Sequence, residues 1–169
     1  MSERPEESAV VSATDVETDE YDHGKRRFRR TRLGHAAGGE DLGTSLYEVE
    51  PGKRTWPPHY HAGNEEALFV LDGELTLWLG SGDDRTEHAL EPGDYVALPA
   101  GPDHAHEVEA TGEETARFLV VSTMNDPDFT VQPDAGKVYL VAGDAPGEYE
   151  DRYLTKTLDV DAEVEYWDE

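Results

Sequence analysis

Two histidines followed closely by carboxylates are the residues of this sequence best suited to chemistry. His59 and His61 are two positions apart, so on a β-strand both imidazoles would point to the same face. A short turn through residues 62–64 would then bring the chain back with Glu65 and Glu66. Two histidines and a carboxylate suit iron, manganese, nickel or zinc and leave coordination positions open. We therefore expect one divalent metal ion, of one of these four elements, at this point of the chain.

A second histidine pair lies further along the chain. His104 and His106 would also share one face of a strand, and either could add a third nitrogen to the site if that strand lies beside the first. The sequence has no cysteine, which excludes disulfides, iron-sulfur clusters and thiolate zinc sites. Any metal must therefore be bound by histidine and carboxylate.

The elements that must position these residues are short strands. Apolar runs with turn residues between them cover 44–50, 66–72, 74–80, 85–90, 94–99 and 116–122. This succession is typical of an antiparallel sandwich or barrel, so the fold class is all-β. Asp72-Gly73 predicts a tight hairpin turn, and 81–84 and 91–94 predict further turns.

The two histidine segments resemble the two sequence motifs of the cupin superfamily. The first family motif is a glycine, two histidines separated by one residue, a glutamate, and a second glycine. His59, His61, Glu66 and Gly73 match it in spacing, and Glu66 is favoured over Glu65 because it stands seven residues before Gly73. The resemblance implies a small cupin with a double-stranded β-helix, or jelly-roll, barrel that encloses the metal.

The second family motif leaves its histidine ambiguous. Its matching positions are Gly93, Pro99 and Gly101. Counting forward from Gly101 selects His104, whereas counting back from a turn expected at 111–112 selects His106. The asparagine that ends the family motif is absent. We predict His106 as the fourth metal ligand, because a hairpin turn at 111–112 would set the strand register, and we keep His104 as the alternative.

The resemblance says less about activity, because one fold carries many reactions. It implies a metal-binding protein that acts on or binds a small polar metabolite. A metal-dependent isomerase of sugars or sugar phosphates is one possibility, with the ion polarising a carbonyl and Glu65 or His104 as the base. An oxygenase is another, and a non-catalytic module that binds a small ligand or metal is the alternative. The resemblance also implies a homodimer.

The charge of the chain is extreme. It has 39 acidic and 14 basic residues and a formal net charge of −25. Because the acids are spread along the whole chain, we interpret them as a halophilic surface whose repulsion is screened in molar salt. Residues 25–32 hold six of the basic residues, and we expect them to pair with the protein's own acids and not with nucleic acid.

The organisation expected from these observations has three parts. Residues 1–40 form an acidic, then basic, N-terminal arm, whose first 24 residues read as disordered or loosely attached. Residues 41–124 form the barrel. Residues 125–169 form a C-terminal extension that packs on the barrel, with one strand at 137–141. No apolar run could span a membrane and no secretory signal is visible, so we expect a soluble, cytoplasmic protein.

Overall fold

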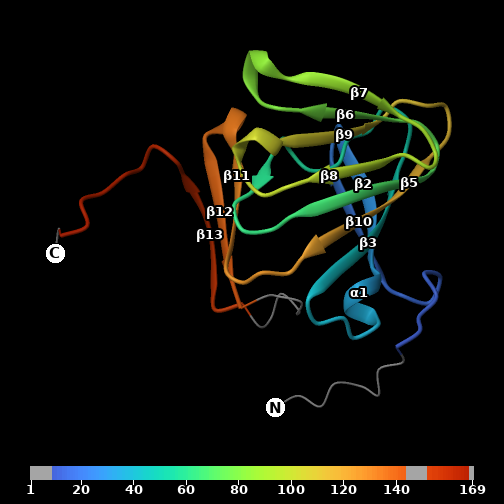
Figure 1. The fold of residues 1–169 in the computed structure, drawn as a ribbon, viewed down its shortest axis with the longest axis horizontal. Coiled ribbons are helices and arrows are strands. Elements are labelled where there is room, and N and C mark those ends of the chain that lie inside the picture. Colours follow the sequence, from blue (N-terminus) through green and yellow to red (C-terminus); the bar gives the residue numbers. More distant parts are fainter. Residues whose placement is uncertain (1–8, 144–151, 168–169) are drawn as a thin grey trace.

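The computed structural model describes residues 9–143 and 152–167, and its strands form three sheets (Figure 1). The largest sheet has the strand order β1-β2-β3-β10-β5-β8, and a smaller one has the order β7-β6-β9. All their ladders are antiparallel. The strands of the larger sheet are β1 (Thr18–His23), β2 (Arg26–Arg32), β3 (Leu42–Val49), β10 (Ala116–Thr123), β5 (Glu66–Asp72) and β8 (Tyr95–Leu98). Those of the smaller sheet are β7 (Thr86–Leu90), β6 (Leu75–Leu79) and β9 (His106–Ala110). This architecture confirms the all-β, jelly-roll fold class.

The hydrophobic core lies between these two sheets. Leu68 and Val70 from β5 and Phe118 from β10 are buried against Leu75 and Leu77 from β6. Each pair of residues two apart shares a face of its strand, as the alternating sequence of a half-buried strand requires. Burial of this apolar surface is the main stabilising term for the barrel.

The turn at Asp72-Gly73 is not the hairpin that the sequence predicts. β5 pairs with β10 and β8, whereas β6 pairs with β7 and β9, so the turn carries the chain from one sheet to the other. Gly73 has a φ of +77°, and a Cβ there would lie 2.7 Å from the Cα of Ala116. The glycine therefore serves a close backbone approach at a corner of the barrel.

The N-terminal segment joins the barrel. The expectation of a loose arm over residues 1–24 is wrong for Thr18–His23, which forms β1 and pairs along its length with β2. β2 continues the sheet by pairing with β3. The sequence suggested disorder because this acidic segment has no apolar periodicity. In the structure, the basic strand β2 lies beside β1 and places opposite charges across the ladder.

The basic block 25–32 pairs with the protein's own acidic side chains, as predicted. The pairs on its exposed side are Arg27 with Asp22 and Glu50, and Arg29 with Glu20 and Glu48, with nitrogen–oxygen distances of 3.5–3.7 Å. Arg32 pairs with Asp19 at 3.2 Å. Exposed pairs of this kind contribute little stability individually, but together they offset the charges of Arg27, Arg29 and Arg32.

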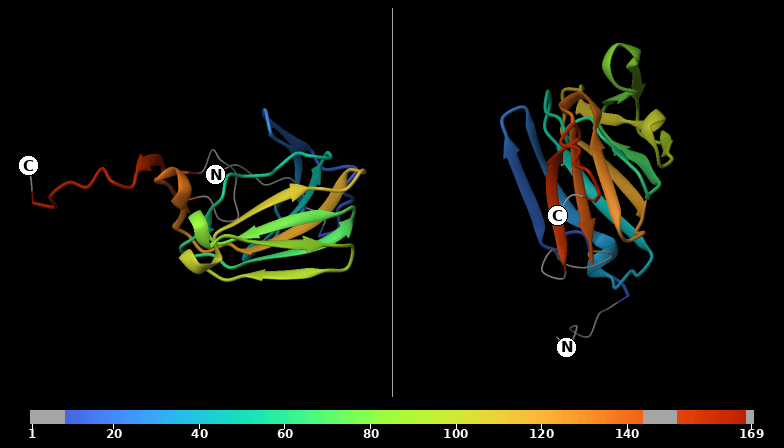
Figure 2. Two further views of the ribbon diagram at one scale, coloured as in Figure 1. Left: turned by 90° about the horizontal axis from the view of Figure 1, so that it is seen from above. Right: turned by 90° about the vertical axis from the view of Figure 1, so that its left-hand side faces the viewer.

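A third sheet, of order β13-β12-β11-β4, closes one end of the barrel (Figures 1 and 2). Its strands are β4 (Tyr60–His61), β11 (Asp128–Gln132), β12 (Lys137–Ala142) and β13 (Leu154–Asp159). In the part of the chain that the structure describes, helical structure consists of α1 (Leu33–Ala36) and the 3₁₀ turns η1 (Gly82–Asp84), η2 (Pro102–His104) and η3 (Pro133–Ala135). Within the described ranges, no helix has the length and apolar character needed to cross a membrane.

Candidate metal centre

His59 and His106 are brought together by the backbone. The two residues form an antiparallel bridge in which each backbone N–H donates to the carbonyl of the other, at 3.1 and 2.8 Å. Their imidazole rings lie 4.6 Å apart between centroids, and both residues are buried. The first histidine of one motif is therefore placed directly against the last histidine of the other.

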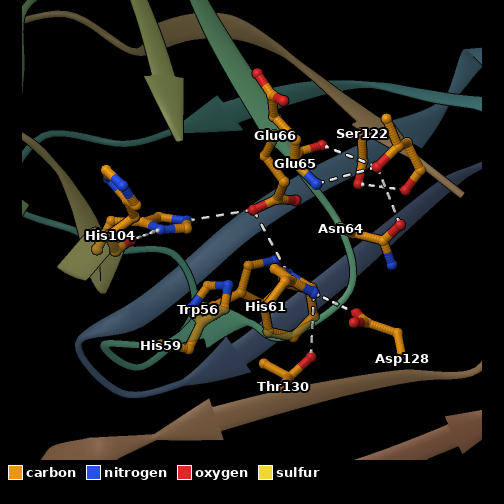
Figure 3. Close-up of polar contacts among 12 residues, drawn as sticks. Trp56, His59, His61, Asn64, Glu65, Glu66, His104, Ser122, Asp128 and Thr130 are labelled. Atoms are coloured by element: carbon orange, nitrogen blue, oxygen red, sulfur yellow. Dashed lines mark hydrogen bonds and ion pairs between the residues drawn. The ribbon is translucent and has the colours of Figure 1, made fainter. Parts of the chain in front are cut away.

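Glu66 completes the cluster from the first residue of β5. Its Oε2 lies 3.4 Å from Nε2 of His106 and 3.5 Å from Nε2 of His61. Figure 3 shows His61 between Glu66 and Asp128. His59, Glu66 and His106 each offer one ligand atom, and these three atoms lie within 4.8 Å of one another. His61 is not part of this group of three, but its Nε2 lies beside the same oxygen of Glu66.

The outward-facing nitrogen of each imidazole is anchored. Nδ1 of His59 lies 2.7 Å from the carbonyl oxygen of Pro57, and Nδ1 of His106 lies 3.0 Å from that of His104. A carbonyl only accepts hydrogen bonds, so in both rings Nδ1 carries a proton, and whenever the ring is neutral Nε2 is the nitrogen with the lone pair. Nδ1 of His61 lies 2.5 Å from Oδ2 of Asp128. Anchored Nδ1 atoms with Nε2 directed inward are the arrangement that histidine ligands of a metal require.

The protonation states of His59 and Glu66 also suit a cation. Burial, with smaller contributions from the neighbouring histidines, lowers the pKa of His59 to about 3, so its imidazole is neutral at physiological pH. Burial raises the pKa of Glu66, but a hydrogen bond from His106 and the nearby imidazole charges outweigh it and lower that pKa to about 2. Neutral imidazole and ionised carboxylate are the forms that bind metals.

The two histidines of the second motif occupy different positions. His106 is buried and faces Glu66, whereas the side chain of His104, in η2, does not line the cavity around the cluster. His106 was predicted as the ligand because a hairpin turn at 111–112 would set its register. The turn at 111–112 instead joins two sheets and is not a hairpin. Pairing of His106 with Leu79 in β6 and the bridge to His59 set its register.

Glu65 does not reach the cluster. It is exposed and does not line the cavity, and its backbone is held by Thr123 through two hydrogen bonds of 3.0 Å. Residues 65 and 66 face opposite sides of the chain because side chains alternate along an extended segment. The suggestion that Glu65 or His104 could serve as a base near the ion is therefore wrong for this geometry.

Asp128 is a site residue that sequence reasoning missed. It is buried at the start of β11, where Oδ2 contacts His61 and Oδ1 accepts the backbone N–H of Gly63 at 3.1 Å. One carboxylate thus holds both the imidazole and the turn that follows it. The hydrogen bond from His61 outweighs the effect of burial and lowers the pKa of Asp128. Asp128 lies outside both motifs, so no spacing pattern marks it.

The cluster lies in a cavity of about 680 Å³, a size suited to a small metabolite. All three sheets line it: Tyr47 and Phe118 come from the large sheet, Val108 from the small one, and Thr130 and Tyr139 from the third. The mixture of aromatic, aliphatic and hydrogen-bonding groups is typical of a binding site for a polar organic molecule.

Comparison with known proteins places the barrel in a family. The family model for the cupin domain matches residues 45–122, which span β3 to β10 and include both histidine motifs. The fold, the two motifs and this match agree, and residues 45–122 form a cupin domain.

Individual relatives extend the comparison. A crystal structure of a putative sugar phosphate isomerase from Acidithiobacillus ferrooxidans is 26% identical, with a TM-score of 0.74 over 93% of this chain and 96% of that one. Germin-like protein 1 of Brassica napus is 31% identical over 57% of this chain, and quercetin 2,3-dioxygenase of Bacillus subtilis is 31% identical over 37% of it. The chain spans only 45% and 17% of the lengths of these two curated relatives.

Proposed function

We propose that this protein is a metal-dependent cupin that acts on a small polar metabolite, and that one divalent ion binds to His59, His61, Glu66 and His106. The observation that carries this proposal is the convergence of His59, Glu66 and His106 in a metabolite-sized cavity, with Nε2 of His61 3.5 Å from Glu66. Three imidazoles and a carboxylate suit iron, manganese, nickel or zinc. Asp128 would orient His61 toward the ion.

Isomerisation of a sugar or sugar phosphate is the reaction that we favour. A divalent ion supplies Lewis-acid polarisation of a substrate carbonyl when it is bound. Hydroxyl and amide groups of the cavity, such as Thr130, Asn64 and Gln132, offer hydrogen bonds to a polyol. The similarity in fold and length to the putative sugar phosphate isomerase of Acidithiobacillus ferrooxidans supports this choice. An oxygenase remains the second enzymatic candidate, since the same ligands can bind ferrous iron.

Proton exchange with solvent tests the isomerase proposal. Protein purified without chelator or affinity metal is analysed for metal, reloaded, and mixed with aldose phosphates in D₂O. We expect deuterium to enter the position beside the carbonyl, as seen by NMR, because isomerisation removes that proton. Glu66→Gln should abolish the exchange, and Glu65→Gln, which removes the neighbouring exposed carboxylate, should leave it unchanged.

The alternative is a non-catalytic binding module. Its support is that the carboxylates lining the described cavity already accept hydrogen bonds: Glu66 from histidine, Asp128 from His61 and Gly63, and Asp126 from the backbone N–H of Gly143 at 2.9 Å. Metal-loaded protein that binds aldose phosphates without deuterium exchange, and consumes no oxygen, would establish the module and exclude both enzymatic candidates.

We also propose a homodimer, formed through the C-terminal strand. β13 is exposed along its whole length at the edge of its sheet, and the segment after it projects away from the barrel (Figure 2). The exposed apolar side chains here are Leu154, Leu158, Val160, Val164, Tyr166 and Trp167. An uncovered edge strand with such side chains favours association.

Light scattering should give twice the chain mass of 18.8 kDa, and a chain truncated after residue 152 should be monomeric. A monomeric full-length chain would contradict the dimer.

The acidic composition leads us to propose adaptation to high salt. With a formal charge of −25, repulsion between surface carboxylates opposes the folded state at low ionic strength. The melting temperature should rise as potassium chloride increases from about 0.1 M to about 1 M, where the Debye length falls to about 3 Å. A melting temperature that stays constant or falls over this range would contradict the halophilic interpretation.

A further inference from the structure

One arginine of the basic block points into the metal cavity. In the ladder between β2 and β3, Arg30 pairs with Tyr47, so its side chain lies on the same face of the sheet as the core. Arg27 and Arg29 alternate with it and face outward, where they meet surface acids. Arg30, by contrast, lines the cavity that contains the metal cluster.

The guanidinium of Arg30 is held in a defined position. Its Nε donates to the hydroxyl of Ser45 at 3.0 Å, and its Cζ lies 5.8 Å from the centre of the Tyr47 ring. Tyr47 is itself fixed, because its hydroxyl accepts a hydrogen bond from Nε1 of Trp56 at 3.0 Å. Trp56 precedes Pro57, the residue whose carbonyl anchors His59. Arg30 and the metal cluster are therefore tied to one rigid set of side chains.

A second cation reaches the same cavity from the opposite end of the chain. Arg152 lines the cavity, and its Nη1 donates to the hydroxyl of Tyr139 in β12 at 2.6 Å. Both arginines lie outside residues 45–122, the segment that the cupin family model matches. The N-terminal hairpin and the C-terminal sheet thus each add one positive charge to the barrel's cavity.

These charges are unusual in a protein with a formal charge of −25. The carboxylates lining the cavity in the described part of the chain are Glu66, Asp126 and Asp128, and each is bound by an imidazole or a backbone N–H. A divalent ion at the cluster would add its charge to that of the two guanidinium groups on the cavity wall. Positive charge on a cavity wall favours an anionic group of a bound molecule.

We propose that Arg30, with Arg152, forms an anion subsite beside the metal centre, so that the substrate carries a phosphate or carboxylate group at a distance from its metal-binding end. This inference rests on the proposed metal-dependent function and deepens it. A planar guanidinium suits both phosphate and carboxylate oxygens, because it can donate two parallel hydrogen bonds. The neutral, hydroxyl-bearing part of such a substrate would lie between the arginines and the ion.

The subsite is tested with three matched probes: ribose 5-phosphate, ribonate and ribose. Calorimetry on full-length protein, both loaded with manganese and metal-free, measures the affinity for each probe. We expect ribose 5-phosphate or ribonate to bind at least about tenfold more tightly than neutral ribose, as a charge-assisted hydrogen bond allows. Comparison of the two anionic probes shows whether the subsite accepts phosphate or carboxylate.

Variants assign this preference to the arginines. Arg30→Gln and Arg152→Gln should each reduce the preference for the anionic probe about tenfold without changing manganese affinity. Arg30→Lys should retain most of it. Arg29→Gln makes the same change of charge one residue away on the outer face and should have no effect. Because the two arginines lie on different elements, Arg152→Gln keeps the test valid if Arg30→Gln does not fold.

Two outcomes would overturn the subsite. One is that the wild-type protein binds ribose and both anionic probes with equal affinity, or binds none of the three. The other is an anion preference that survives both glutamine variants. Failure of the metal proposal is seen separately, because a protein that retains no manganese can still show the arginine-dependent preference in its metal-free form.

Discussion

Replacement of His59, His61, Glu66 or His106 by alanine should abolish metal retention or weaken it sharply. Each substitution removes one donor from a site in which the remaining groups are buried and positioned to share a cation. Loss of one anchored ligand is not compensated by neighbouring side chains, because strand geometry directs alternate residues away. Metal content of protein prepared without chelator, measured by elemental analysis, checks each variant.

Neighbours in the sequence provide the matched controls. Tyr60→Phe and Glu65→Gln change residues that flank the proposed ligands on the other side of the strand, and both should retain the ion. His104→Ala should do less damage than His106→Ala, because His104 supports the site only through its backbone carbonyl. Full metal content in the His59, His61 and Glu66 variants would refute the proposed centre.

Glu107→Gln should lower the free energy of unfolding by about 3 kcal/mol, since loss of one partner leaves buried charges uncompensated. Glu107 follows His106 but faces the outside of the smaller sheet, where its side chain is fully buried. Its carboxylate binds Arg26 at 2.6 Å, Arg54 at 3.2 Å and also Arg85. Arg26 in addition donates to two backbone carbonyls at 55 and 56. This carboxylate therefore clamps the N-terminal hairpin to the barrel, and thermal melting should shift down by about 10 °C.

The contribution of Glu107 should depend on pH in a defined direction. Burial raises its pKa, but the hydrogen bonds from Arg85 and Arg26 outweigh burial, so the pKa lies below its ordinary value of 4.5. A lowered pKa in the folded state means that the stabilisation is complete above about pH 5 and is lost as the pH falls through the folded-state pKa. The difference in stability between wild type and Glu107→Gln should therefore shrink in acid.

Glu109→Gln is the matched control for this cluster. Glu109 lies two residues further along β9, on the same face, and among the described residues it pairs with Arg54 alone, at 2.7 Å. Because it is partly exposed, its loss should cost less than about 1 kcal/mol. If Glu107→Gln and Glu109→Gln have equal melting temperatures and equal free energies of unfolding in denaturant, the three-arginine clamp does not stabilise the fold.

The sequence by itself determined the fold class and the group of residues that converge. Alternating apolar runs predicted the barrel strands, and the spacing of His59, His61 and Glu66 placed three donors on one side of the chain. Such patterns are local, because the side chains of a strand alternate with a period of two. For the same reason the five arginines and one lysine of residues 25–32 could be recognised as a charged block but not sorted by direction.

Tertiary structure decided what depends on pairing between distant strands. The bridge from His59 to His106 separated the two candidate histidines, and the exchange of sheets at Gly73 replaced an expected hairpin. Pairing of β11 with β4 set Asp128 against His61, and pairing of β2 with β3 turned Arg30 into the cavity. The contact between His61 and Asp128 alone joins residues 67 positions apart. No local periodicity records them, because the register between two strands is a property of the assembled sheet.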